Sequence, residues 1–154
     1  MENTCCFTGH RIIPLNEEPR IRERTGDEIA RLIDRGVDTF ITGGARGYDT
    51  LCAQTVLCFK NTYPHIKLHL ALPCENQTKG WPRESVRLYE EILSRADETT
   101  YVGRAYDGGC MYRRNRFLVD SSSYVIAYCV KKTGGSYYTV KYAEAENKTI
   151  IYIT

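Results

Sequence analysis

The sequence has no long hydrophobic run, since no apolar segment approaches the ~20 residues needed to cross a bilayer. Residues 1–4 lack the basic and apolar regions of a secretory signal, so we expect a cytoplasmic protein with reduced thiols and no membrane contact. An excess of either charge is also missing: 21 Lys and Arg residues against 19 Asp and Glu residues leave a net charge of +2. This balance argues against a polybasic surface, and we do not expect nucleic acid as a partner.

Repeats, low-complexity tracts and linker-like stretches are absent too, which predicts one domain over residues 1–154. The seven cysteines form no metal-ligand pattern. Cys5 and Cys6 are adjacent, so on a strand they point to opposite faces, and no second cysteine pair completes a zinc site. We therefore expect neither a metal nor a cofactor.

Short apolar runs alternate with longer amphipathic segments, a pattern typical of an α/β domain with a mainly parallel sheet. The apolar runs predict six strands, at 5–8, 39–42, 67–72, 99–102, 124–128 and 149–153. Five helices are predicted between them, of which the fourth spans 113–119 and the fifth 137–146. Parallel strands need right-handed crossovers, so helices should cover both faces and produce a Rossmann-like three-layer sandwich.

Glycine-rich loops follow the predicted strands, at the sheet edge where open α/β sheets bind ligands. A glycine turn that leads into a helix presents free N–H groups at the positive end of the helix dipole, which favours phosphate. Three of these loops add a cation, namely Arg11, Arg46 and Lys131 or Lys132. We therefore predict that a phosphate lies across the loops at 9–11, 43–47 and 134–139.

The candidate residues also have structural interpretations. Asp49 can cap the helix that follows it or contact a ribose. Arg114 and Asn115 either face the base and ribose or pair with surface acids, and Tyr106 either stacks on the base or packs ordinarily. The predicted ligand-binding residues are Gly9, His10, Arg11, Gly43, Gly44, Arg46, Gly47, Asp49, Tyr106, Asn115, Asp120, Gly134, Gly135, Ser136 and Thr139.

Four segments resemble motifs of small YpsA-like proteins in the SLOG superfamily, the Rossmann-like group named for the Lonely guy (LOG) and DprA proteins. The segments are residues 6–11 (CFTGHR), 42–49 (TGGARGYD), 113–120 (RRNRFLVD) and 134–139 (GGSYYT), in the order that the family has them. The resemblance implies a Rossmann-like fold, a pocket for nucleotides or nucleotide-derived molecules, and a homodimer.

The resemblance also implies alternative activities. LOG-type enzymes release a base from a nucleoside monophosphate, using an Arg before the fifth strand and a Glu just after the late Gly-Gly-Thr motif. Arg114 matches that Arg and is the candidate catalytic residue, whereas the first acid after Thr139 is Glu144. Our leading prediction is a binder of a nucleotide or nucleotide-derived molecule, as a sensor or regulatory domain. The alternatives are a phosphoribohydrolase-like N-glycosidase and DprA-like binding of single-stranded DNA.

Overall fold

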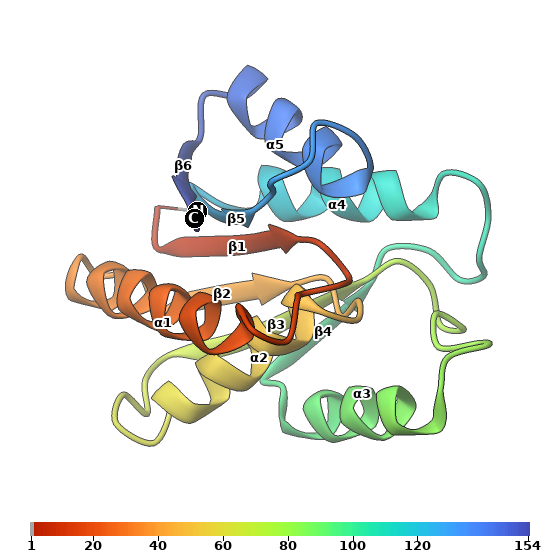
Figure 1. Cartoon of the computed structure of the whole chain (residues 1–154), viewed down its shortest axis with the longest axis horizontal. Helices are drawn as coiled ribbons and strands as arrows, with labels where there is room; N and C mark the ends of the chain where they lie inside the picture. The colour runs from red at the N-terminus through yellow and green to blue at the C-terminus, as the bar shows by residue number, and fades with distance from the viewer. Residues whose placement is uncertain (1) are drawn as a thin grey trace.

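A computed structural model describes residues 2–154 and shows strands and helices in strict alternation (Figure 1). The strands are β1 (Thr4–Gly9), β2 (Thr39–Thr42), β3 (Lys67–Leu72), β4 (Glu98–Tyr101), β5 (Tyr124–Tyr128) and β6 (Thr149–Tyr152). The helices are α1 (Glu18–Asp34), α2 (Tyr48–Phe59), α3 (Arg83–Arg95), α4 (Cys110–Asp120) and α5 (Gly135–Ala145).

The strands form one parallel sheet in the order β4-β3-β2-β1-β5-β6. The chain adds strands outward from β1 as far as β4 and then returns to the other side of β1, so the strand order reverses between β1 and β5. Helices α1, α2 and α3 cover one face of the sheet, and α4 and α5 cover the other (Figure 1). The predicted Rossmann-like three-layer architecture is confirmed.

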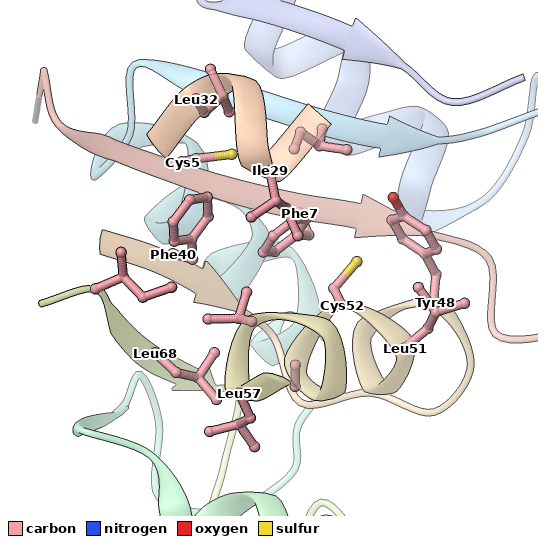
Figure 2. Packing of buried hydrophobic residues seen from close by; sticks show 14 of the residues in the cluster. Cys5, Phe7, Ile29, Leu32, Phe40, Tyr48, Leu51, Cys52, Leu57 and Leu68 are labelled. Atoms are coloured by element: carbon pink, nitrogen blue, oxygen red, sulfur yellow. The ribbon is translucent and has the colours of Figure 1, made fainter. Parts of the chain in front are cut away.

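Alternation along β1 divides the core between the two faces of the sheet. Cys5 and Phe7 belong to the larger apolar cluster, whereas Cys6 belongs to a smaller cluster with residues of α4 and α5. Figure 2 shows the larger cluster, in which the rings of Phe7 and Phe40 stack with centroids 6.1 Å apart and α2 supplies Cys52. The central strand is thus buried on both faces, which anchors the loop that follows it.

Two helices begin earlier than the periodicity predicts. Helix α4 begins at Cys110, because the Asp107 carboxylate accepts the Gly109 N–H at 2.8 Å and pairs with Arg113 at 2.6 Å, which closes the preceding turn. Helix α5 begins at Gly135, after a residue with a φ of +91° that favours glycine. Of the helices in the part of the chain that the structure describes, none is both long and apolar enough to cross a membrane.

Candidate functional site

A cavity of about 250 Å³ lies where the carboxyl end of β1 meets α4 and the first residues of α5. We call it the switch-point cavity, because the strand order reverses between β1 and β5 at this place. Nine of the predicted site residues line it: Gly9, His10, Arg11, Asp49, Arg114, Asn115, Gly134, Gly135 and Ser136.

Arg114 reaches the floor of the switch-point cavity from α4 and is only 5% exposed. Its Nη1 donates to the carbonyl oxygen of Gly43, and its Nε donates to Oδ1 of Asn115 at 2.9 Å. A Cβ on Gly43 would collide with the guanidinium, so this glycine admits the arginine side chain. Burial lowers the pKa of Arg114, and the nearby Asp49 carboxylate opposes that shift.

Asp49 lies in the first turn of α2 and is 7% exposed. Its Oδ2 accepts the N–H of Ala45 at 3.1 Å, so the side chain fastens the preceding loop and does not cap the helix. Burial raises the pKa of the Asp49 carboxyl, while the charge of Arg114 and the Ala45 N–H act in the other direction. Among residues 2–154, no ion pair within 4.0 Å joins Asp49 to Arg114.

The wall of the cavity formed by the start of α5 has groups nearby that can bind an anion. Helix α5 begins there without a side-chain cap, so no side chain satisfies its first N–H groups, and they lie beside the cavity at the positive end of the helix dipole. Because Oδ1 of Asn115 accepts from Arg114, its Nδ2 is left to donate, and that atom lies 3.9 Å from a Cβ built on Gly135. The exposed Arg11 adds a positive charge at the rim.

His10 connects two loops at the rim of the cavity. Its Nε2 accepts the N–H of Val130 at 2.9 Å, which ties the loop after β1 to the loop after β5 and requires a neutral imidazole. Burial lowers the pKa of His10, and Lys131 lowers it further.

The remaining predicted residues lie outside the switch-point cavity. Arg46 turns away and places its guanidinium 5.4 Å from the centre of the Trp81 ring. Asp120, at the far end of α4, accepts the Tyr142 hydroxyl at 2.7 Å, and the Thr139 hydroxyl donates to its own helix. Tyr106 is 63% exposed in the loop before α4. Gly43, Gly44 and Gly47 do not line the cavity either, although Ala45 of the same loop does.

Several lining residues were missed by the sequence interpretation. Met111 and Leu118 lie on the same face of α4 as Arg114 and Asn115, at spacings of three and four residues. A helix assumed to begin at 113 includes Leu118 but leaves out Met111, whereas one that begins at Cys110 places both residues on this face. No group of three or more His, Cys, Asp or Glu side chains within residues 2–154 is arranged to hold a metal ion.

Comparison with known proteins finds relatives over nearly the whole chain. A UPF0398 protein of Halalkalibacterium halodurans is 31% identical over 127 residues, which cover 80% of this chain and 67% of that protein. DNA processing protein A of Helicobacter pylori, whose structure was described for its single-stranded DNA binding mode, has a TM-score of 0.70 at 18% identity. The matched region covers 97% of this chain and 64% of that one.

The protein of the same name from Streptococcus pneumoniae also has a TM-score of 0.70, at 16% identity, with 98% of this chain and 50% of that one covered. This chain therefore spans between half and two thirds of these structural neighbours. The TM-scores establish a common fold, and at such low sequence identity they say nothing about function.

The exclusion of nucleic acid as a partner was wrong. A protein with this fold binds single-stranded DNA, so neither the fold nor a net charge near zero can exclude such a partner. The physical reason is that net charge averages over the whole surface, whereas a strand senses the potential of the groove in which it lies.

One family model, described as the YspA SLOG family, matches residues 5–154. The chain belongs to this YpsA family.

Proposed function

We propose that this chain binds a nucleotide or nucleotide-derived molecule in the switch-point cavity, with a phosphate group at the N-terminus of α5. The observation that carries the proposal is the convergence of three kinds of anion-binding group around one cavity: the first N–H groups of α5, the Asn115 amide and Arg11. The cavity volume of about 250 Å³ lies a little below the range of roughly 300–1,000 Å³ that is typical of small-molecule sites.

Calorimetric titration of nucleoside monophosphates tests this proposal. Arg11→Ala should weaken binding by about tenfold or more, because it removes a charge-assisted contact to phosphate. Arg46→Ala is the matched control and should leave the affinity unchanged, because Arg46 stacks on Trp81 outside the cavity. Failure of the wild-type protein to bind any monophosphate, or equal affinity in Arg11→Ala, would overturn the proposal.

Binding of single-stranded DNA is the second candidate, and a separate groove favours it. This groove, which we call the Arg46 groove, has a volume of about 500 Å³ and shares Arg11 with the switch-point cavity. Arg46 lines it, and Trp81 lies beside that arginine as a planar aromatic group. Cationic side chains beside an aromatic ring are the usual means of holding a strand without sequence preference. DNA processing protein A has the same fold and binds single-stranded DNA, which supports this candidate.

Fluorescence anisotropy with a labelled oligonucleotide distinguishes the two candidates. If a strand follows the Arg46 groove, Arg46→Ala and Trp81→Ala should both weaken its binding, and the affinity should fall steeply with salt as phosphates release their counterions. Mononucleotide binding should be insensitive to both substitutions. The absence of any oligonucleotide binding at low salt would exclude the second candidate.

Cleavage of the nucleotide has less support from the geometry. The carboxylate that LOG-type enzymes place near the sugar follows the late glycine motif, yet Glu144 lies near the end of α5, outside the cavity, where it pairs with Lys141 at 3.3 Å. The carboxylate that does line the cavity, Asp49, comes from a different element, α2. We expect chromatography to recover a bound nucleoside monophosphate intact after prolonged incubation. Free base that no longer forms with Arg114→Ala would instead establish a phosphoribohydrolase.

A further inference from the structure

Two buried, oppositely charged side chains line the switch-point cavity without forming an ion pair. Asp49 and Arg114 are each the strongest opposite charge acting on the other's pKa. No nitrogen of Arg114 comes within 4.0 Å of an Asp49 oxygen in the described part of the chain. Such charges are costly to bury unless something polar satisfies them.

Each of the two groups has unused hydrogen-bonding capacity. Within residues 2–154, the Nη2 of Arg114 donates a hydrogen bond only to the thioether sulfur of Met111, at 3.7 Å, and sulfur is a weak acceptor. On Asp49, Oδ2 accepts the Ala45 N–H, while Oδ1 accepts no hydrogen bond from residues 2–154. The cavity therefore has one strong donor and one strong acceptor to offer a ligand.

The chemistry of the pair restricts what can lie between them. A ligand anion would be repelled by Asp49, and a ligand ammonium group would be repelled by Arg114. A hydroxyl group is neutral and both donates and accepts, so it can donate to Asp49 and accept from Arg114 at the same time. The phosphate then belongs at the other wall, by α5.

We propose that Asp49 and Arg114 bind the sugar hydroxyls of a ribose whose phosphate lies at the N-terminus of α5. This inference rests on the proposed function and specifies its ligand as a ribonucleotide. The two subsites are neighbours, because Asn115 accepts from Arg114 through Oδ1 and presents Nδ2 beside Gly135. A single sugar phosphate can therefore reach both.

The test compares adenosine monophosphate with its 2′,3′-dideoxy analogue by calorimetry, with inorganic phosphate as a third probe. Wild-type protein should bind the ribonucleotide about tenfold or more tightly than the dideoxy analogue, because hydrogen bonds to two charged groups are lost. Asp49→Asn retains an acceptor for the Ala45 N–H and removes the charge. It should bring this affinity ratio close to one and leave the affinity for inorganic phosphate undiminished.

Asp120→Asn is the matched control, since it makes the same change on a carboxylate outside the cavity and should keep the wild-type ratio. Equal affinity of the wild-type protein for both nucleotides would overturn this inference and leave the proposed function standing. Binding of neither nucleotides nor phosphate would overturn both. The wild-type comparison can overturn the inference even if Asp49→Asn does not fold.

Discussion

Two glycines beside the cavity admit side chains of the protein itself. A Cβ on Gly9 would collide with the ring of Tyr48, and one on Gly43 would collide with Arg114. The Tyr48 ring is fully buried, and its hydroxyl lies 2.8 Å from that of Thr25 on α1. These glycines shape the cavity indirectly, by letting α2 and α4 approach the strand ends.

Gly47→Ala should destabilise the protein more than Gly80→Ala. Both glycines have a positive φ, of +79° and +83°, so each alanine should cost about 1–2 kcal/mol of stability through its backbone conformation. At Gly47 the new Cβ also meets the backbone of Arg11, whereas at Gly80 no atom of the described residues, chain neighbours apart, lies within 4 Å. That overpacking should add about 1–3 kcal/mol. Urea denaturation measures both variants, and equal losses would contradict the placement of the 43–47 loop against Arg11.

Acid should destabilise the native state through His10. Burial, with Lys131, lowers its pKa in the folded protein, so the unfolded chain binds a proton more readily. The contribution of His10 to stability is therefore complete above the unfolded pKa of about 6.5 and is lost as the pH falls below it. His10→Gln should flatten the dependence of the free energy of unfolding on pH in this range. His69→Gln must be measured in parallel, because burial lowers that pKa as well.

At the scale of elements, α5 contributes its uncapped first turn to the cavity. An anion there would be stabilised by the helix dipole whether it belongs to a ligand or to the protein. A charge introduced in this turn should therefore change both the stability of the ligand-free chain and its affinity for the ligand.

Ser136→Asp should therefore have opposite effects on stability and binding. Ser136 lies in the first turn of α5 and lines the cavity, so a carboxylate there should stabilise the ligand-free protein by about 0.3–1 kcal/mol. It should also repel phosphate and weaken nucleotide binding. Thermal unfolding and calorimetry measure the two effects, with Ser136→Ala as the control. Unchanged nucleotide affinity in Ser136→Asp would place the phosphate elsewhere.

At the scale of the whole molecule, the sheet has a protected centre and open edges. Strand β1 pairs on both sides, whereas β4 and β6 each pair on one side. A cavity at the end of a strand that pairs on both sides has a rigid wall, which favours a preformed site. The homodimer that the resemblance implies stays a prediction.

Native-state hydrogen exchange should show stronger protection of amides in the central strand than in the edge strands. Amides of Cys6 and Phe7, in the middle of β1, should exchange only when the whole chain unfolds, because both residues are fully buried. Amides of β4 should exchange through local opening, with little dependence on denaturant. Comparable protection in β1 and β4 would contradict the order of the strands.

Local sequence was enough to predict the alternation of strands and helices along the chain and the sheet edge that holds the cavity. Hydrophobic periodicity and glycine turns are properties of short segments, and they imply parallel strands whose carboxyl ends share one edge. Hence residues directly after β1 and at the start of α5, such as Arg11 and Gly135, were correctly expected to lie close together.

Tertiary packing decided where the side chains of the other loops point. Arg46 and Asp49 belong to one segment, yet the first stacks on Trp81 while the second enters the cavity. Arg114 donates to Gly43, 71 residues away in the chain, and this contact forms only when α4 packs on the sheet. Such directions depend on neighbours brought together by folding, and no local pattern encodes them.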